Sequence, residues 1–408
     1  MIKELNVIEF STFCKNNPLC NYMQSEDFAK VMQSFHYDYE FIGYVGDRGE
    51  ISAASLILIK NIYKNLKYGY APKGFMLNYY DDELMNKFTT QLKEYYAKKN
   101  VVFIKINPEI VVGEIESKTL FYESNANSRL KKDIVKYGFR HLKDNLYFES
   151  VEPRYNAYID LKNTQFNDFS KSNRNKVHNS MRKGLYACKV SGDEVKNGLE
   201  LMKQKPQEYY AKLYDYFNKD DKVDLITIKV DFQKYVLNVQ SLYDEEERNN
   251  ALLNEVLHRS NKQVDLNKKM ASDRLLTSLK NELVYATYEL KNNNDITVAS
   301  ALVIKDKYRV HVIDSGYDKK YSILNANYFL YNELISMYKK DYDYLDIGAV
   351  SGDFRSTNPY YGLNRFKLGY APSVYEYIGE YDLIIDKNNY EMLLNSGILA
   401  SVFNKRCE

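Results

Sequence analysis

A glycine-containing loop in the last quarter of the chain carries the residues best suited to chemistry. Asp346 closes a short apolar segment and is followed by Gly348 and Gly352. Glycines placed in this way mark tight turns or points where the backbone comes close to a ligand. Loops at strand ends are also where α/β proteins bind their ligands. The pair Phe366 and Lys367 follows this loop, although turn glycines and a core phenylalanine would explain the same residues.

A second candidate is the segment 170–184, SKSNRNKVHNSMRKG, which gathers positive charge on an expected helix. Cationic side chains combined with a helix end can hold phosphate groups. A solvated helix face accounts for the same charges equally well. The cationic residues of this segment are Lys171, Arg174, Lys176, Arg182 and Lys183.

Two further motifs lie in the first third of the chain. The sequence YGYAPKGF at 68–75 places Tyr70 close to Lys73 and Gly74, which could line a pocket or form a plain loop. Asn107 follows an apolar segment and precedes a proline. A residue at the end of a buried strand is well placed for a binding site.

Several kinds of chemistry are not supported by any motif. The chain has no phosphate-binding P-loop and no dinucleotide-binding fingerprint. It also lacks the RxxGxG/A pyrophosphate loop of acyl-CoA-dependent acetyltransferases, and no serine or cysteine triad is recognisable. The four cysteines and five histidines show no metal-ligand spacing. We therefore expect neither a metal nor a cofactor.

The elements that must position these motifs include an internal repeat. EISAASLILIK at 50–60 matches DITVASALVIK at 295–305 with five of eleven positions identical, at an offset of 245 residues. Both segments are short, apolar and β-branched, as buried strands are. A duplicated α/β unit would set two similar domains side by side, with a cleft between them for a large substrate.

The remaining pattern is that of a mixed α/β protein. A Gly-Asp-Arg-Gly turn at 46–49 predicts a hairpin between the first two strands. Gly184 fits the end of a helix that begins near residue 163. We expect strands at 41–45, 51–59, 101–106, 158–161, 186–190, 297–304, 310–315 and 344–347, and helices at 81–99, 163–183 and 328–340.

A long helical insertion interrupts the second repeat. No glycine occurs from Leu199 to Ser315, and apolar residues recur at spacings of three and four around residues 266–290. Two ordinary helices packed on a core would be the alternative, but the many charges leave too little apolar surface for burial on all sides. We therefore expect an antiparallel coiled-coil arm. The expected domains are residues 1–153, residues 154–230 together with 292–386, the arm at 231–291, and a C-terminal helical tail at 387–408.

Composition bounds the remaining function classes. The chain has 408 residues, 45% hydrophobic and 27% charged, with a net charge of +2. These values are typical of an ordinary globular protein, so any polyanion site must be a local basic patch. The N-terminus shows no secretory segment, and the apolar run at 51–59 is too short to cross a membrane. We expect a cytoplasmic protein that can touch the inner face of the cell membrane.

The four motifs, in this order and with the helical insertion, resemble the FemABX family of peptidoglycan interpeptide-bridge aminoacyltransferases. The resemblance covers essentially the whole chain and looks closest to the FemA-like, methicillin-resistance-factor subgroup. The basic segment 170–184 and YAPKG at 70–74 are supporting matches. The most specific part is a C-terminal run of three motifs. They are VSGDF at 350–354, YGLNRFKLGY at 361–370, which ends on Tyr370, and YIGEYDLIID at 377–386.

The resemblance implies two tandem acetyltransferase-like (GNAT-like) domains with a coiled-coil arm. Members transfer an amino acid, such as Gly, Ala or Ser, from aminoacyl-tRNA to an amine on the stem peptide of a lipid-linked or UDP-linked muropeptide. The donor is already an activated ester, so no cofactor is needed, and alignment of the reactants supplies much of the acceleration. Lys367, with Phe366, would act at the acceptor end of the tRNA. The resemblance makes the arm a candidate tRNA contact. It is also compatible with a homodimer or with an association with paralogous transferases. The implied substrate-binding residues are Tyr70, Lys73, Gly74, Asn107, Arg174, Asp346, Gly348, Gly352 and Tyr370.

Three departures from the family pattern leave alternatives open. Many relatives carry a lysine where this chain has Met32, and many carry Asp where it has Asn107. The segment 203–217 is also shortened. These departures favour, as an alternative, a non-catalytic or regulatory paralogue that acts through partner binding. A CoA-dependent N-acyltransferase is the third hypothesis, against which the missing pyrophosphate loop argues. The general base is unassigned.

Overall fold

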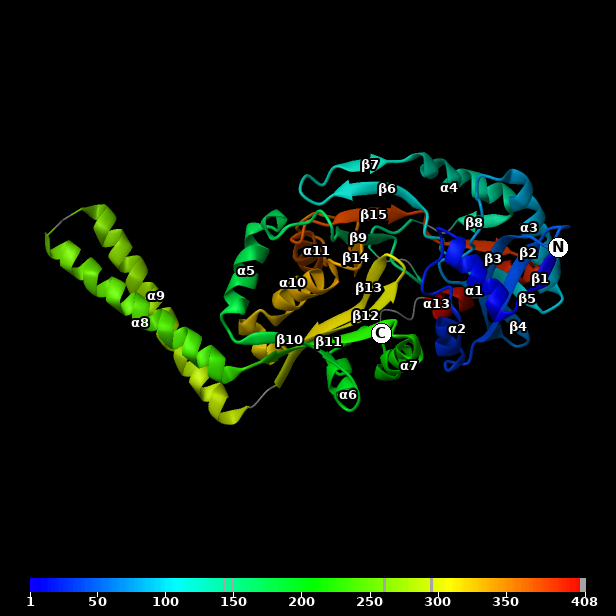
Figure 1. Ribbon diagram of the computed structural model, residues 1–408. Helices are drawn as coiled ribbons and strands as arrows, with labels where there is room; N and C mark the ends of the chain where they lie inside the picture. Colours follow the sequence, from blue (N-terminus) through cyan, green and yellow to red (C-terminus); the bar gives the residue numbers. More distant parts are fainter. Residues whose placement is uncertain (142–143, 148–149, 260–261, 294–295, 404–408) are drawn as a thin grey trace.

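The computed structural model describes residues 1–141, 144–147, 150–259, 262–293 and 296–403. It contains two β-sheets flanked by helices, and a pair of long helices that projects from one end of the molecule (Figure 1). The sheets lie side by side, with the N-terminal part of the chain in one and the middle of the chain in the other.

The first sheet has seven strands. β2, β3 and β4 pair antiparallel, and β4 and β5 pair parallel. In spatial order the strands are β1 (Ile2–Glu4), β2 (Asp38–Val45), β3 (Ile51–Tyr63), β4 (Leu66–Ala71), β5 (Val101–Ile106), β16 (Tyr381–Ile384) and β8 (Phe139–His141).

The second sheet has nine strands and repeats this arrangement. β11, β12 and β13 pair antiparallel, and β13 and β14 pair parallel. In spatial order the strands are β10 (Leu185–Val190), β11 (Val223–Val230), β12 (Ile296–Asp306), β13 (Arg309–Tyr317), β14 (Tyr344–Ala349), β9 (Tyr155–Asp160), β15 (Ser373–Tyr377), β6 (Val111–Glu116) and β7 (Tyr122–Ser124).

The sequence repeat corresponds to β3 and β12, which occupy the same place in the two sheets. In each repeat a pair of helices precedes the antiparallel strands and one helix precedes the last parallel strand; we call the two repeats unit 1 and unit 2. Ser55 and Ser300, identical in the repeat, are both fully buried. The helices are α1 (Val7–Asn16), α2 (Glu26–Gln33) and α3 (Asp82–Ala97) in unit 1, and α6 (Glu194–Leu199), α7 (Gln207–Phe217) and α10 (Ala326–Tyr338) in unit 2.

Two segments pair in the sheet of the other unit. β6 and β7, which follow unit 1 in the sequence, form the edge of the nine-stranded sheet, and β16, which follows unit 2, lies inside the seven-stranded sheet. This exchange ties the units together through backbone hydrogen bonds. A domain boundary drawn along the chain at residue 153 therefore separates strands that share a sheet, and the division into domains stays a proposal.

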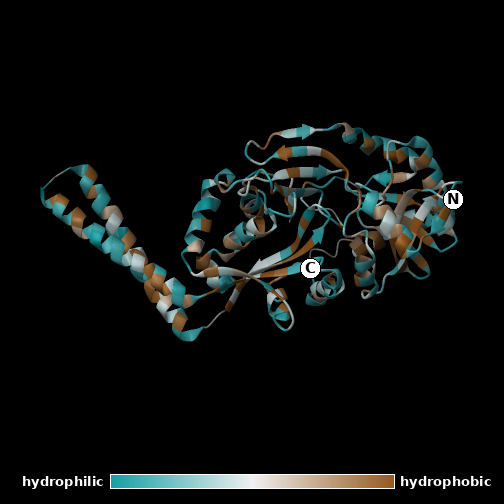
Figure 2. Cartoon of the chain, viewed as in Figure 1, coloured by the Kyte–Doolittle hydropathy of each residue, from teal (hydrophilic) through white to brown (hydrophobic). Residues whose placement is uncertain are grey.

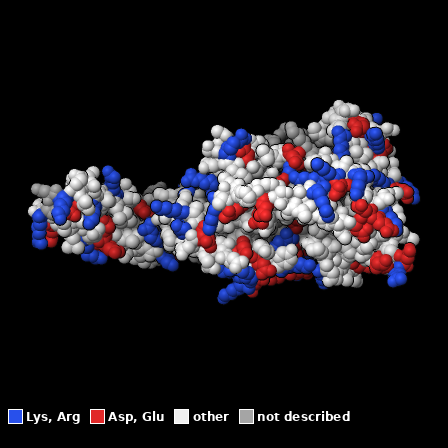
Figure 3. All heavy atoms as spheres, turned by 90° about the horizontal axis from the view of Figure 1, so that it is seen from above, with Lys and Arg blue, Asp and Glu red and all other residues white. Residues whose placement is uncertain are grey.

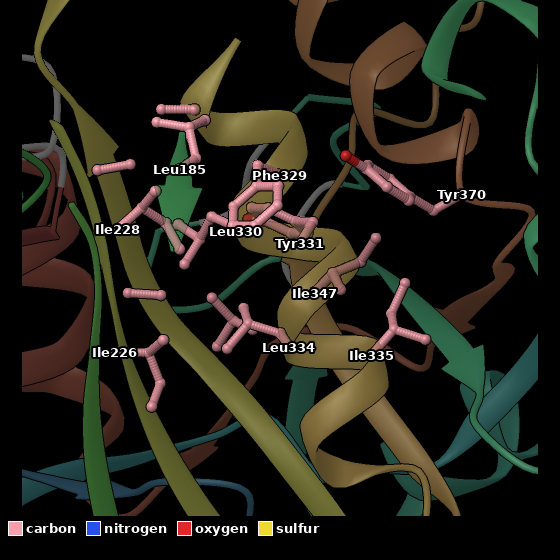
Figure 4. Close-up of a cluster of buried hydrophobic side chains, with 14 of the residues drawn as sticks. Leu185, Ile226, Ile228, Phe329, Leu330, Tyr331, Leu334, Ile335, Ile347 and Tyr370 are labelled. Atoms are coloured by element: carbon pink, nitrogen blue, oxygen red, sulfur yellow. The ribbon is translucent and has the colours of Figure 1, made fainter. Parts of the chain in front are cut away.

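Apolar side chains hold each sheet to its helices. Side chains of α10 pack against Ile226 and Ile228 of β11 (Figure 4). A second cluster joins the units, because α2 and α7 pack together between the sheets with Leu225 and Leu302 of unit 2. Burial of this shared apolar surface favours one fixed arrangement of the two units.

The insertion forms the projecting arm that the sequence predicts. α8 (Phe232–Arg259) and α9 (Gln263–Asn292) run antiparallel, in the place where unit 1 has its short turn at 46–49. Tyr235, Val239 and Leu279 anchor the base of the arm in the core of unit 2. Further out, Asn250 donates to Ser272 at 2.9 Å inside the helix pair. Figure 2 shows polar and apolar residues intermixed along the arm.

The expected helix at 163–183 is shorter than predicted. α5 (Lys171–Met181) begins after Ser170, whose hydroxyl accepts from the amide of Asn173 at 3.2 Å. Gly184 adopts a φ of +67°, as its predicted place at the helix end requires.

Short helices complete the fold: α4 (Leu130–Asp133), α11 (Tyr361–Leu368), α12 (Lys387–Asn395) and α13 (Ile398–Phe403). Among the helices of the described residues, none is both long enough and apolar enough to cross a membrane.

Candidate active site where β13 and β14 diverge

The parallel strands β13 and β14 pair only over a short stretch. Arg309 to His311 lie opposite Tyr344 to Asp346, after which β14 continues alongside β9. Beyond this point the facing edges of β13 and β14 no longer bond to each other. Unpaired backbone groups between diverging strands are available to a ligand.

Lys367 reaches this divergence from α11. Its Nζ donates a hydrogen bond to the carbonyl oxygen of Ala349 at 2.8 Å, and the residue is only 8% exposed. Gly348 has a φ of +78°, and a Cβ there would lie 3.4 Å from the Nζ of Lys367. A side chain at Gly348 would therefore be strained and would crowd the amine.

Burial lowers the pKa of Lys367 to about 8, although the carboxylates of Asp346 and Asp314 act in the opposite direction. A buried amine loses the hydration of its charged form, and nearby anions recover part of that loss. The amine can therefore change its charge close to neutral pH. Such a group is suited to stabilising negative charge that develops during a reaction.

Asp346 is held from two sides. Its Oδ2 lies 3.0 Å from Nδ1 of His311, and its Oδ1 accepts from the amide of Gly348 at 2.8 Å. Burial alone would raise the pKa of Asp346, but the contact with His311, the hydrogen bond from the Gly348 amide and the charge of Arg309 together hold the pKa below its usual value. Asp346 is thus an ionised, oriented carboxylate beside Lys367.

The loop between β14 and α11 is fixed by side-chain amides. The Oδ1 of Asn364 accepts from the amide of Ser351, and its Nδ2 donates to the carbonyl of Ser351, both at 2.9 Å. Asn358 donates to the Ser351 hydroxyl at 2.9 Å. Gly352 packs so closely on Tyr155 that a Cβ would lie 2.5 Å from the ring. These contacts set the position of α11, and with it that of Lys367.

Phe366 and Tyr370 have packing contacts. Phe366 meets the rings of Tyr328, Tyr331 and Tyr370 edge-on, with centroids 5.0 to 5.6 Å apart. Tyr370 is fully buried, and its hydroxyl donates to the carbonyl of Tyr328 at 3.1 Å. The structure thus gives both residues a place in the core behind Lys367, and a direct role in chemistry stays a prediction.

In unit 1 the predicted residues form a second cluster. The Oδ1 of Asn107 accepts from the backbone amide of Lys73 at 2.9 Å and from the hydroxyl of Tyr70 at 3.4 Å. A Cβ at Gly74 would lie 2.5 Å from Oγ of Ser55, so this loop must approach β3 closely. The strand end and the loop after β4 are therefore held together, a contact that the sequence did not predict.

The two clusters meet along the seam between the units. The Nζ of Lys73 lies 5.2 Å from the ring centre of Tyr377, whose hydroxyl is 2.6 Å from that of Tyr158 in β9. Arg309 of β13 forms an ion pair with Glu109 of unit 1 at 3.0 Å. The sites at the ends of β5 and β14 thus open onto one polar interface.

The basic segment is only partly available to a ligand. Arg174 donates to the backbone carbonyls of Asn167 and Phe169 at 2.7 and 2.6 Å, so its guanidinium fixes the loop before α5. Lys171 and Arg182 are exposed. No acidic residue occurs between 169 and 192, so the face of α5 is positively charged. The structure places Arg174 outside the Lys367 cluster, and its substrate contact stays a prediction.

Three residues of the seam carry buried polar atoms for which the described residues supply no hydrogen bond. They are Nδ2 of Asn107, Oδ1 of Asn156 and Nε2 of His311. The sequence marked Asn107 but not the others, because His311 and Asn156 lie in ordinary alternating strand patterns. A polar residue inside a strand next to Asp346 is the signal that could have drawn attention to His311. Unsatisfied buried polar atoms at an interface indicate a place for a polar ligand or water.

The sequence profile described as the FemAB family matches residues 5–394. The chain belongs to the FemAB family. A curated relative, the lipid II:glycine glycyltransferase of Staphylococcus aureus strain MRSA252, is 23% identical over 406 residues, which cover 94% of this chain and 93% of the relative. The protein of the same name from strain N315 matches with the same identity and coverage.

The crystal structure of FemX shares the fold of this FemAB protein. It superimposes with a TM-score of 0.73 and 20% sequence identity, and the match covers 96% of this chain and 99% of FemX. The fold class expected from the sequence, two tandem α/β units with an inserted helical arm, is confirmed.

Met32, where many relatives are expected to carry lysine, packs against the apolar cluster between the units. This partly buried side chain therefore contributes to packing at that position. Lys73 is a cation of unit 1 that does lie at the seam.

Proposed function

We propose that this FemAB protein is an aminoacyltransferase that moves an amino acid from aminoacyl-tRNA to an amine on the stem peptide of a peptidoglycan precursor. The observation that carries the proposal is the buried amine of Lys367, set at the divergence of β13 and β14. Family membership and the name of the curated relatives, lipid II:glycine glycyltransferase, support the reaction class and a lipid-linked acceptor.

The reaction needs little from the protein beyond alignment and charge. The acceptor amine attacks the ester carbonyl, the bond to the tRNA ribose oxygen breaks, and an amide forms while a proton passes from nitrogen to the departing oxygen. Lys367 in its charged form stabilises the negative charge on the carbonyl or ribose oxygen. Unit 1, with Tyr70, Lys73 and Asn107 at the seam, would hold the acceptor, and binding both reactants across the seam supplies proximity.

The charge distribution supports a tRNA contact on unit 2. α5 presents Lys171 and Arg182 without a neighbouring acid in the sequence, and phosphates are attracted by local positive charge. On the arm, α8 and α9 carry eight basic and nine acidic residues. Figure 3 shows both signs mixed on the arm. We therefore assign the phosphate contact to α5 rather than to the arm.

The amino acid is Gly, Ala or Ser by family, and the protein would work at the inner face of the membrane, where a lipid-linked acceptor lies. An assay with purified protein, a pool of labelled aminoacyl-tRNAs and a lipid-linked muropeptide tests the proposal. Transfer from one charged tRNA is the expected result and names the donor. A protein that transfers no label, next to an active relative as control, would overturn the proposal in favour of a partner-binding role.

A parallel reaction tests the competing acyl donor. Acetyl-CoA replaces the charged tRNAs with the same acceptor, and we expect no acetylated product, because the chain lacks a pyrophosphate loop. Acetyl transfer at a rate comparable to a known acetyltransferase would show a CoA-dependent enzyme instead.

A further inference from the structure

His311 lies directly opposite Asp346 in the short parallel stretch of β13 and β14. Its Nδ1 is 3.0 Å from Oδ2 of Asp346, and the two residues are 4% and 6% exposed. An ionised carboxylate can only accept a hydrogen bond, so Nδ1 carries the proton. The contact is a buried, charge-assisted hydrogen bond.

The other ring nitrogen faces the seam between the units. Nε2 of His311 has no hydrogen-bond partner among the described residues. The ring centre lies 5.1 Å from that of Tyr22, in the loop between α1 and α2, and Oδ2 of Asp306 in β12 is 4.0 Å from Nε2. The imidazole is therefore clamped between Tyr22 of unit 1 and Asp346 of unit 2.

Asp346 connects this imidazole to the buried amine. Its second oxygen accepts from the amide of Gly348, and the space above Gly348 is where the Nζ of Lys367 lies. The acids that raise the pKa of Lys367 are Asp346 and Asp314. The side chains that interact electrostatically with Asp346 include His311, Arg309 and Lys367 itself. Asp314 is already engaged by the hydroxyl of Tyr210 at 2.5 Å and by Gln204 at 2.8 Å. Asp346 is thus the carboxylate through which unit 1 can influence Lys367.

We propose that His311 is a positioning residue, which holds Asp346 ionised and oriented beside Lys367 and so keeps the amine charged at neutral pH. The inference deepens the proposed function, since it concerns the same amine. It assigns His311 no contact with the reacting atoms. Loss of the Nδ1 donor would let Asp346 take up a proton more readily, and Lys367 would then lose the larger of its two compensating charges.

The test uses a matched pair of substitutions. His311→Phe keeps a ring in the clamp but removes the donor, whereas His311→Asn places an amide N–H close to the position of Nδ1. The full-length protein is labelled with lysine carrying ¹³C at Cε, and the Lys367 signal is assigned with Lys367→Arg. The chemical shift is then followed from pH 6 to 11 by NMR.

We expect His311→Phe to lower the titration midpoint of Lys367 by about one pH unit. In His311→Asn the midpoint should stay within about 0.3 pH units of the wild-type value. Equal midpoints for His311→Phe and the wild type would overturn the proposal and leave His311 a packing role. Asp346→Asn provides a second measurement should His311→Phe fail to fold. A lower titration midpoint of Lys367 in Asp346→Asn would support the dependence of the amine on this carboxylate. An unchanged midpoint would refute it.

The NMR titration needs no substrate, so its outcome is separate from that of the proposed function. If transfer is observed, the alkaline limb of the pH–rate profile should move to lower pH in His311→Phe and return in His311→Asn. If no aminoacyl transfer is found but the Lys367 midpoint still responds to His311, the proposed reaction fails while the positioning inference holds.

Discussion

The Nζ of Lys367 lies 2.8 Å from the carbonyl oxygen of Ala349, where β14 has already separated from β13. This one contact places a buried amine at a point where two parallel strands no longer pair. The amine has no carboxylate within ion-pair distance among the described residues, since its direct partner is a neutral carbonyl. In our proposal, this charge acts on the substrate.

The first prediction concerns the pH dependence of aminoacyl transfer. The pKa of Lys367 is lowered to about 8, and the charged form is the active one in our account. Activity should therefore be present below pH 8 and fall as the pH rises through this value. The kcat/KM for transfer, measured from pH 6 to 10 with a correction for ester hydrolysis, should show an alkaline limb near 8. A flat profile up to pH 9.5 would contradict the assigned role.

A second prediction follows for stability. In the unfolded chain Lys367 regains an ordinary pKa near 10.5, while the folded protein binds this proton only below about 8. Between these values the unfolded state holds more protons, so folding is favoured as the pH rises, by about 1.4 kcal/mol per pH unit. The wild type should gain roughly 2 kcal/mol relative to Lys367→Met between pH 8 and 9.5.

This difference is measured by urea unfolding of both proteins at pH 7, 8 and 9.5. Because all other groups titrate equally in the two proteins, their contributions cancel in the comparison. At pH 7 the variant should be at least as stable as the wild type, since a buried cation is replaced by an apolar side chain. If Lys367→Met were less stable than the wild type by the same amount at every pH, the pKa of Lys367 would not be lowered in the folded protein.

Asn107 provides a third prediction. Its Oδ1 accepts from the amide of Lys73, while its Nδ2 has no hydrogen-bond partner among the described residues. Asn107→Ala should cost about 1–3 kcal/mol of stability, because the buried amide of Lys73 loses its acceptor. Asn107→Asp keeps an oxygen there and should cost less. Urea unfolding of both variants compares them, and equal losses would show that the Oδ1 contact contributes nothing.

The fourth prediction separates the arm from α5 as the tRNA contact. Residues 247–271 are replaced by a short Gly-Ser linker, which keeps the arm base at Tyr235, Val239 and Leu279 in the core. A second variant reverses two exposed charges of unit 2, Lys171→Glu with Arg182→Glu. We expect the KM for aminoacyl-tRNA to rise less than about 3-fold in the first and more than about 10-fold in the second.

The salt dependence of the KM provides a check on this pair. The charge-reversal variant should show a weaker dependence on salt, because fewer phosphate contacts are made. The opposite order, with a large effect of the truncation and a small effect of the reversal, would assign the tRNA contact to the arm.

Much of the architecture could be predicted because it depends on local pattern. β5 occupies the predicted range 101–106, since every residue of this β-branched strand is buried. The arm was predictable because no glycine interrupts the charged, periodic segment. The repeat placed β3 and β12 in equivalent positions, because a duplicated strand keeps its neighbours in the sheet.

The exchange of strands between the units was not predictable in this way. β6 (VVGEIE) and β16 (YDLI) mix apolar with acidic residues and are not among the strands expected from the sequence, and their pairing depends on contacts with residues far away in the sequence. Local pattern decides that a segment is a strand but not which sheet it joins. The sequence therefore suggested two domains that each keep their own strands, the second of them interrupted by the arm.

The candidate site was predicted in part. Asp346, Gly348 and Lys367 do come together, because a loop and a short helix return the chain to the end of β14. The sequence could not separate Lys367 from Phe366, whose ring packs in the core one residue away. Nor did the sequence pair His311 with Asp346, since this contact depends on the register of two strands, in which the two residues are 35 positions apart.

The central claim is that Lys367 is the residue of this protein on which aminoacyl transfer depends. The most direct test compares single-turnover transfer from the cognate aminoacyl-tRNA to a lipid-linked muropeptide by the wild type, Lys367→Ala and the exposed control Lys387→Ala. We predict that Lys367→Ala lowers the rate at least ~100-fold with both substrates still bound, while the control keeps the wild-type rate. Full transfer activity of Lys367→Ala would contradict the account.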